Sequence, residues 1–168
     1  MTSNHLKRRE RPGAREGDRM DIFNCQLAAK QVMKLTGLSY ARLDYWLRPE
    51  RGNIVTCTVP AQGKGSDRVF SFLDVIRIRA VKRLRDRGVS LQMVRKVVRE
   101  LTERYQIKDP LAETGQLLVA GDRLFWVLDD TALLDVLKGQ LAAHPLMILP
   151  VAEIIADTRA KVAALMAA

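Results

Sequence analysis

Apolar residues recur every three or four positions in several segments of the chain, the spacing typical of amphipathic helices. The first predicted helix runs from about Asn24 to Leu35, and the second from about Tyr40 to Leu47. Between them, Gly37 is suited to a left-handed helix end and Ser39 to a helix N-cap, while Arg48-Pro49 ends the second helix. Two helices joined by a short turn that holds a glycine predict a helix-turn-helix.

A segment rich in strand formers follows the second helix. Residues 54–59 (IVTCTV) favour a β-strand, and residues 68–70 (RVF) can pair back on it. The intervening tip is polar and contains Lys64. A β-hairpin directly after a helix-turn-helix forms a wing, so the pattern predicts a winged helix-turn-helix.

Two further helices are predicted after the wing. Ser71 caps the first, over about residues 72–87, and Ser90 caps the second, over about residues 91–105, with Gly88 ending the first. The first of them has an apolar stripe and an opposite basic face. We expect this basic face to be mostly solvated, with one or two members near its start reaching phosphates. The stripe consists of Leu73, Ile76, Ala80, Val81 and Leu84, and the basic face of Arg77, Arg79, Lys82, Arg83, Arg85 and Arg87.

The pattern changes after Asp109-Pro110. Residues 116–128 (QLLVAGDRLFWVL) predict two short strands around a tight turn. Asp130 or Thr131 then caps a predicted short helix that ends at about Lys138.

A final helix closes the chain. Residues 146–149 are predicted as a short strand or an extended link, and Pro150 is suited to the first turn of a helix. One side of that helix is too apolar for a free tail, so it must pack on another surface. The fold class predicted is mainly α with small β elements, a winged helix-turn-helix followed by a small α+β domain. The predicted division is a disordered basic arm at 1–21, the winged-helix domain at 22–107 and a C-terminal domain at 108–168.

Charge is distributed unevenly along the chain. The formal net charge is +9, but residues 25–107 hold seventeen Lys/Arg against seven Asp/Glu, a net charge of +10. Residues 108–168 hold five against eight, a net charge of −3. The basic middle favours a polyanion as partner, and charge alone equally allows a highly soluble surface. The sequence has no run of about eighteen apolar residues, so no membrane-spanning helix is predicted. The basic start lacks the apolar stretch of a secretion signal.

Few residues of the chain suit catalysis or metal binding. Cys25 and Cys57 do not form a CxxC pair, and His5 and His144 lie far apart, so neither a zinc site nor another metal site is predicted. No glycine-rich phosphate loop or nucleophile–base set is visible. We therefore expect no enzyme activity and no cofactor.

Beyond these patterns, the residues around the predicted helices resemble the MerR-type winged-helix family. The family's usual turn, recognition helix, wing exit and late glycine all have counterparts here, and the resemblance covers about residues 25–105. The counterparts are Thr36-Gly37-Leu38-Ser39, Leu43-Asp44-Tyr45-Trp46, Arg68-Val69-Phe70 with Ser71–Val75, and Arg87-Gly88-Val89-Ser90-Leu91.

Two departures from the family pattern affect the expected site. The family's Arg before the paired aromatics is Asp44 here, which either reads a cytosine amino group or pairs with a nearby Arg such as Arg48. The wing is longer than usual. Tyr45-Trp46 looks like the Tyr-Trp variant of MerR-like regulators that lack a metal or drug sensor. The C-terminal part is similar to a small domain of unknown function found on MerR-like bacterial proteins, some of them antitoxin-type.

The resemblance implies double-stranded DNA as the partner, with the 40–48 helix in the major groove. Arg42 is expected to fork onto guanine, and Trp46 to pack in the core. Lys64 and Arg68 are expected on the backbone or minor groove, although Arg68 can equally fix the wing to the helix-turn-helix. The complete set of expected DNA contacts is Ser39, Tyr40, Arg42, Tyr45, Arg48, Arg51, Lys64 and Arg68.

The function expected is that of a cytoplasmic, nucleoid-associated transcriptional regulator acting as a homodimer. An antitoxin-type protein that binds a toxin through residues 108–168 and autoregulates by DNA binding is the alternative. A third interpretation is an excisionase-like architectural protein. Dimerisation is expected through one stripe of the final helix, which comprises Ile154, Ile155, Thr158, Val162 and Leu165.

Overall fold

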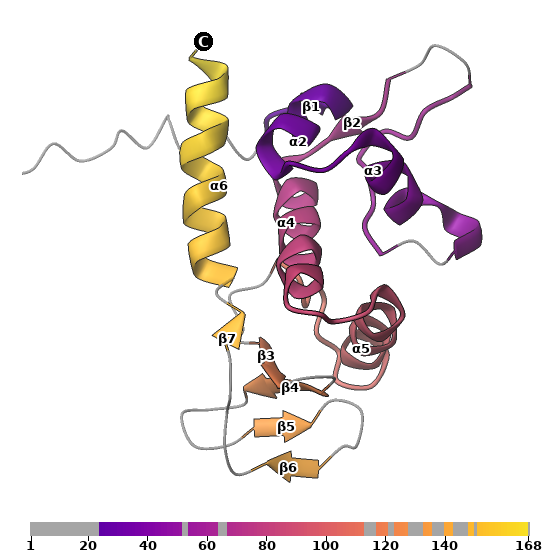
Figure 1. Ribbon diagram of the computed structural model, residues 1–168, viewed down its shortest axis with the longest axis vertical. Coiled ribbons are helices and arrows are strands. Elements are labelled where there is room, and N and C mark those ends of the chain that lie inside the picture. Colours follow the sequence, from indigo (N-terminus) through magenta and orange to yellow (C-terminus); the bar gives the residue numbers. More distant parts are fainter. Residues whose placement is uncertain are drawn as a thin grey trace, which may run out of the picture.

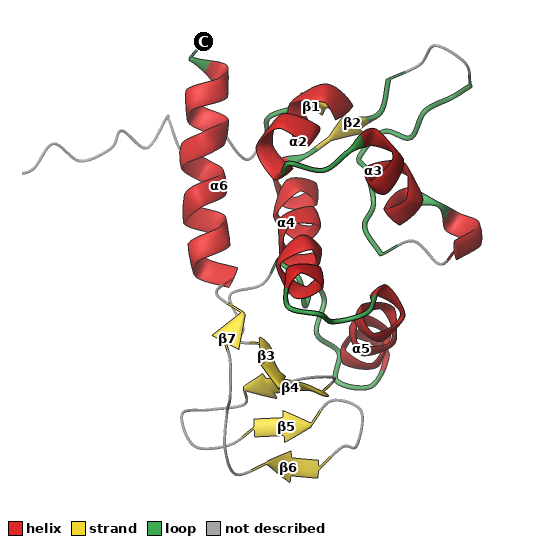
Figure 2. Ribbon diagram, viewed as in Figure 1, coloured by secondary structure: helices red, strands yellow, loops and turns green. Residues whose placement is uncertain are grey.

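A computed structural model shows a bundle of short helices on which a longer C-terminal helix packs, with a small β-sheet at one end (Figure 1; Figure 2). The predicted arm at 1–21 and Lys64 lie outside the described residues. The residues that the structure describes are 24–51, 54–63, 67–112, 117–120, 123–127, 133–135, 140–142, 148–149 and 151–167.

The helix-turn-helix consists of α2 (Ala29–Thr36) and α3 (Tyr40–Leu47). Gly37 adopts a left-handed conformation with φ 69°, and its N–H donates to Met33 O at 2.8 Å. Ser39 Oγ accepts from the Arg42 N–H, as the N-cap prediction requires. Both helix ends in the turn, and the end of α3 before Pro49, are confirmed.

The start of the first helix was predicted too early. Leu27–Ala28 forms a short strand, β1, which pairs antiparallel with β2 (Val69–Phe70). The helix begins only after this strand, where the Ala28 N–H donates to Gln31 Oε1 at 2.9 Å. The apolar spacing of Leu27 and Ala28 fitted a helix, but the long-range partner strand decides their conformation.

The predicted hairpin of the wing is paired over a shorter stretch than expected, because residues 54–58 do not form a strand. Among the described residues of the wing, which we define as residues 54–70, the two arms meet at a single bridge between Val59 and Val69. Ile54 and Val55 are buried instead, and the Ile54 N–H donates to Trp46 O. These two residues therefore pack in the core beside α3. They follow the short 3-10 helix Pro49–Arg51 in the sequence.

The next two helices were predicted nearly to the residue. They are α4 (Phe72–Asp86), capped by Ser71, and α5 (Leu91–Glu103), capped by Ser90. Gly88 between them has φ 87°. The apolar stripe of α4 needs one correction, because Leu73 is 42% exposed. The buried side also includes Phe72, Val75 and Ile78.

Beyond α5, the chain forms a five-stranded antiparallel sheet in the order β6-β5-β4-β3-β7. The predicted strand pair is confirmed as β3 (Leu117–Ala120) and β4 (Arg123–Val127), and β7 (Ile148–Leu149) settles the predicted alternatives for 146–149 in favour of a strand. The predicted helix up to Lys138 is wrong. Its residues contribute β5 (Leu133–Asp135), because Leu134 pairs across from Trp126 on β4 and β6 (Gln140–Ala142) continues the sheet.

The last helix, α6 (Val151–Met166), lies along α4 and also contacts α2 (Figure 1). Ile154, Thr158 and Val162 are at most 4% exposed, and Ile154 and Val162 belong to the same hydrophobic core as the helix-turn-helix. Arg79 on α4 bonds to Thr158 Oγ1 at 2.7 Å and forms an ion pair with Asp157. The expectation that this helix packs on another surface is thus confirmed within the chain.

Candidate nucleic-acid interface

Helix α3 divides cleanly into a buried and an exposed side. Leu43, Trp46 and Leu47 are buried, which confirms the core position predicted for Trp46. On the other side, Tyr40 is 57% and Tyr45 38% exposed. The exposed residues also include Ser39, whose hydroxyl caps the helix, and Arg42. Four of the predicted DNA contacts therefore share one accessible surface.

Asp44 binds two arginines from different segments. Its Oδ2 accepts hydrogen bonds from Nε and Nη2 of Arg48, at 2.9 and 2.8 Å, and its Oδ1 accepts one from Nη2 of Arg68, at 2.7 Å. Of the two roles predicted for Asp44, the structure thus shows the pairing with Arg48, and Arg68 is a second partner. Arg68 belongs to the wing, so the carboxylate ties the wing to α3.

The Asp44 carboxylate stays charged over the neutral pH range. Hydrogen bonds from Arg48, and then from Arg68, hold the pKa of Asp44 below its usual value. A lowered pKa in the folded state means that this tie stabilises the fold above the ordinary carboxyl pKa. The stabilisation is lost as the pH falls through the lower, folded-state value.

Arg48 and Arg68 differ in how much of their side chains faces solvent. Arg48 is 50% exposed and also lies 3.8 Å from Glu50, whereas Arg68 is 20% exposed. One guanidinium nitrogen of Arg68, Nη1, is buried without a hydrogen-bond partner among the described residues. Arg68 therefore fits the second role predicted for it, fixing the wing. For Arg51 the structure describes only the backbone.

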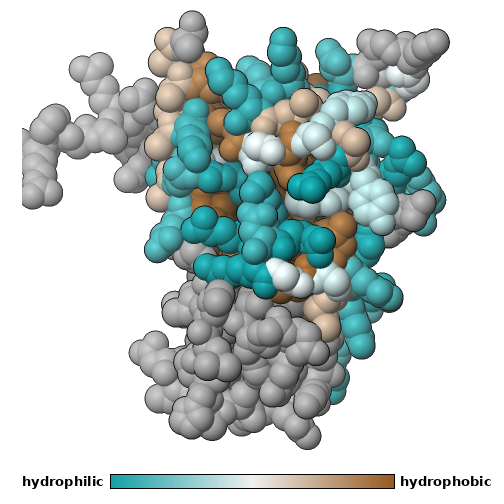
Figure 3. Space-filling view, viewed as in Figure 1, coloured by the Kyte–Doolittle hydropathy of each residue, from teal (hydrophilic) through white to brown (hydrophobic). Residues whose placement is uncertain are grey.

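A hollow of about 540 Å³ separates α3 from the end of α4. Its lining includes Arg42 and Tyr45 on one side and Lys82 and Arg85 on the other. Lys82 pairs with Asp86 at 2.7 Å, and Arg85 donates to Val89 O. On the face seen in Figure 3, hydrophilic side chains cover much of the helical part of the molecule.

The basic face of α4 differs from its prediction. Its early members are engaged inside the chain: Arg77 pairs with Asp74 and Asp109, and Arg79 pairs with Asp157. The late members Lys82 and Arg85 lie beside α3 instead. Sequence reasoning missed this, because the acidic partners of Arg77 and Arg79 lie far away in the sequence.

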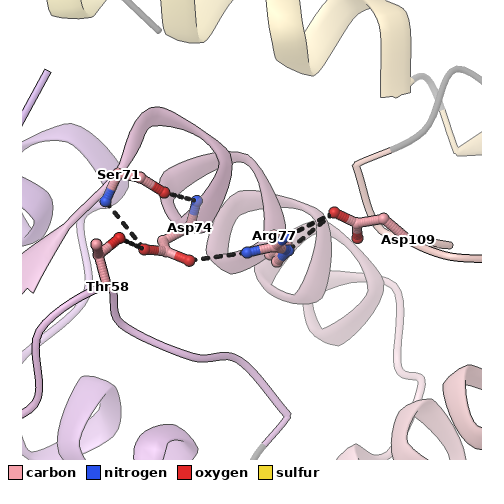
Figure 4. Close-up of polar contacts among 5 residues, drawn as sticks. All are labelled: Thr58, Ser71, Asp74, Arg77 and Asp109. Carbon is pink, nitrogen blue, oxygen red and sulfur yellow. Dashed lines mark hydrogen bonds and ion pairs between the residues drawn. The ribbon is translucent and has the colours of Figure 1, made fainter. Parts of the chain in front are cut away.

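Asp74 is the centre of a second polar cluster, at the start of α4 (Figure 4). It is 2% exposed, and its Oδ2 accepts from Thr58 Oγ1 at 2.8 Å and from the Ser71 N–H at 2.9 Å. Its Oδ1 accepts from Arg77 Nη1 at 2.8 Å. Arg77 donates in turn from Nε and Nη2 to Asp109 Oδ2, at 3.0 and 2.7 Å (Figure 4).

Arg77 keeps its charge in this half-buried position. Burial lowers the pKa of a guanidinium, but hydrogen bonds and charge attraction from Asp109 and Asp74 outweigh it and raise the pKa of Arg77.

Cys25 and Cys57 are free thiols, and burial raises the pKa of both. In the described part of the chain, no three His, Cys, Asp or Glu residues gather as a metal site would require.

Comparison with known proteins connects this geometry to a family. The model of the MerR HTH family of regulatory proteins matches residues 27–101, the segment from β1 to α5 that holds both polar clusters except Asp109. The chain carries a MerR-type helix-turn-helix domain. The MerR-type domain thus includes α3, the wing and the basic end of α4.

Relatives of the MerR-type domain are named as regulators. The chain is 39% identical over 71 residues to an uncharacterized HTH-type transcriptional regulator of Mycobacterium tuberculosis, a match that covers 42% of this chain and 31% of the relative. It is 33% identical over 88 residues to the HTH-type transcriptional regulator GlnR of Bacillus cereus, covering 51% of this chain and 64% of the relative. The chain therefore spans less than two thirds of either protein. No described helix is long and apolar enough to cross a membrane.

Proposed function

We propose that the chain is a sequence-specific regulator of transcription that binds double-stranded DNA, with α3 in the major groove and the wing on the backbone or minor groove. The observation that carries this is the accessible side of α3, where Tyr40, Arg42 and Tyr45 stand beside arginines that Asp44 holds in place. Arg and Tyr side chains on a recognition helix can bond to base edges and phosphates.

Charge supports the same proposal. The +10 segment, residues 25–107, contains α3 and both the wing and the basic end of α4. Such a surface attracts a polyanion at a distance and releases counterions from DNA on binding, which makes the affinity depend on salt. The named relatives are transcriptional regulators, which agrees with DNA as the partner.

The test is binding to a fluorescent duplex carrying the DNA upstream of the chain's own gene, measured over a salt series. Wild type is expected to prefer it over scrambled DNA by at least about a thousandfold, the lower end of specific binding. Arg42→Ala should reduce that preference by about 1–3 kcal/mol, because it removes a base contact. Lys64→Ala should weaken both duplexes equally and lower the salt slope by about one.

Arg99→Ala serves as the matched control. Arg99 is exposed on α5, and its replacement by Ala removes one positive charge, as Arg42→Ala does. It should leave the preference unchanged. Weak binding by wild type that ignores sequence at every salt concentration would refute the assignment of α3 as a recognition helix.

We further propose that the regulator is a homodimer, which implies a palindromic or direct-repeat operator. Three members of the predicted dimerisation stripe, Ile154, Thr158 and Val162, are buried within the chain, whereas Ile155 and Leu165 are half-buried. A dimer through α6 must therefore use its opposite side. That side of α6 carries exposed small residues at helical spacing, namely Ala152, Ala156, Ala160 and Ala163.

The acidic charge of residues 108–168 supports the competing proposal, an antitoxin that holds a basic toxin through this part. Purification from the native host distinguishes the two. A dimer of the chain alone favours the regulator, and a second protein in equal amount favours the antitoxin.

A further inference from the structure

The first arm of the wing is bonded to β2 and to the start of α4 at neighbouring points. Val59 and Val69 exchange two backbone hydrogen bonds, each of 3.0 Å. Next to this bridge, Thr58 bonds to Asp74 at 2.8 Å. Among the described residues these contacts join the first arm of the wing to β2 and to the start of α4. Arg68 fixes the second arm to Asp44 of α3, whereas the place of the first arm depends on where the Asp74 carboxylate is held.

Asp74 is held from its other side by Arg77. A buried carboxylate such as that of Asp74 needs charged or hydrogen-bonding partners, since its burial is otherwise costly. Arg77 supplies the positive charge, through Nη1 on Asp74 Oδ1. Nε and Nη2 of Arg77 both donate to Asp109 (Figure 4), so the orientation of the Arg77 guanidinium is set by both carboxylates.

Asp109 lies outside the helix-turn-helix, in the segment that leads from α5 to the sheet. This segment also approaches the wing directly. A small hollow of about 170 Å³ is lined by Val55 and Thr56 of the wing together with Lys108 and Asp109. The chain after α5 and the first arm of the wing are thus neighbours, and they are joined through Arg77 and Asp74.

We propose that Asp109 is a positioning residue for the wing, acting through Arg77, Asp74 and Thr58. Its consequence for DNA rests on the proposed function, in which the wing contacts the duplex. Asp109 itself does not contact DNA. It fixes Arg77, which fixes Asp74, and Asp74 fixes the arm of the wing at Thr58.

This role reverses the effect that charge alone would give. Removing an acidic group from a DNA-binding surface strengthens binding, because the attraction to phosphate rises. Loss of Asp109 instead loosens the first arm of the wing, so Asp109→Asn should weaken DNA binding although the chain becomes more basic. Glu103→Gln, at the exposed end of α5, makes the same charge change without touching the cluster.

The first measurement needs no DNA. Amide hydrogen exchange of Val59 and Val69 is followed by NMR in wild type, Asp109→Asn, Thr58→Val and Glu103→Gln. Exchange at these two amides should become about fivefold faster in Asp109→Asn and in Thr58→Val, as expected for the loss of one hydrogen bond, and stay at the wild-type rate in Glu103→Gln. Unchanged exchange in Asp109→Asn would overturn the proposal. So would faster exchange throughout the chain, because it would mean general destabilisation.

The second measurement connects the cluster to DNA by a double-mutant cycle with Lys64→Ala, between the two arms of the wing in the sequence. Asp109→Asn should lower the affinity about threefold to tenfold, and Lys64→Ala should then have little further effect. Full additivity, or tighter binding like that of Glu103→Gln, would refute an action through the wing. If wild type ignores DNA sequence, the proposed function fails, while the exchange rates still decide whether Asp109 positions the wing.

Discussion

Asp44 is the residue at which the sequence departs from the family pattern and the structure explains the departure. In the DNA complex that we propose, an acidic group on α3 would repel phosphate if it stood alone. Asp44 binds Arg48 and Arg68, so the positive charge of both arginines is partly neutralised within the chain. The expected benefit is geometric, because two flexible side chains are held in one orientation beside α3.

Replacing Asp44 by Asn should therefore strengthen binding to scrambled DNA and reduce discrimination. The variant gains one positive charge and frees two arginines to contact any phosphate, so we expect about threefold to tenfold tighter binding to scrambled duplex at low salt. The preference for the operator should shrink by a similar factor. Titrations with both duplexes at matched salt measure this, with Glu103→Gln, which makes the same charge change at an exposed position of α5, as control. Weaker binding to both duplexes would show instead that Asp44 contacts DNA through its own carboxylate.

At the scale of the elements, local chemistry predicted the helices better than the strands. Ser39, Ser71 and Ser90 cap three helices where they were expected to, because a cap acts within three residues of its own position. Strands need a partner distant in sequence. Leu27–Ala28 became a strand because Val69–Phe70 lies beside it, and Leu133–Asp135 because β4 does.

The candidate site shows the same division. The exposed side of α3 followed from its apolar spacing, so Tyr40, Arg42 and Tyr45 could be chosen from sequence. The ion pairs of the α4 arginines could not be predicted from sequence, since Arg77 meets Asp109 and Arg79 meets Asp157 only in the folded chain. Whether a basic residue is free for DNA depends on acids 32 and 78 positions away.

Substitutions of Gly37 test how much the turn of the helix-turn-helix contributes to stability. Its φ of 69° is unfavourable for a residue with a Cβ, although a Cβ would meet no atom within 4 Å. Gly37→Ala should thus lower the free energy of unfolding by about 1–2 kcal/mol through backbone strain alone. Asn tolerates this conformation better, so Gly37→Asn should lose less. Urea denaturation followed by circular dichroism compares them, and equal losses would contradict this account.

At the scale of the whole molecule, the position of α6 bears on how the chain is divided. The predicted boundary at 107/108 separates α6 from the helix-turn-helix. In the structure, one core contains Ile154 and Val162 of α6 together with Leu43 and Trp46 of α3. Arg79 adds a polar tie between α4 and α6. A shared core predicts that both parts unfold together.

Shortening a buried side chain of α6 should therefore destabilise the helix-turn-helix. Ile154 is 4% exposed, so Ile154→Ala should lower the free energy of unfolding by about 2–4 kcal/mol, whereas Ile155→Ala on the same helix should cost less because Ile155 is only half-buried. With Trp126→Phe as the background, Trp46 alone reports on α3 during urea denaturation. A lower midpoint of the Trp46 signal in Ile154→Ala is expected. An unchanged midpoint would mean that α6 folds apart from the helix-turn-helix, and the boundary at 107/108 would then divide two independent units.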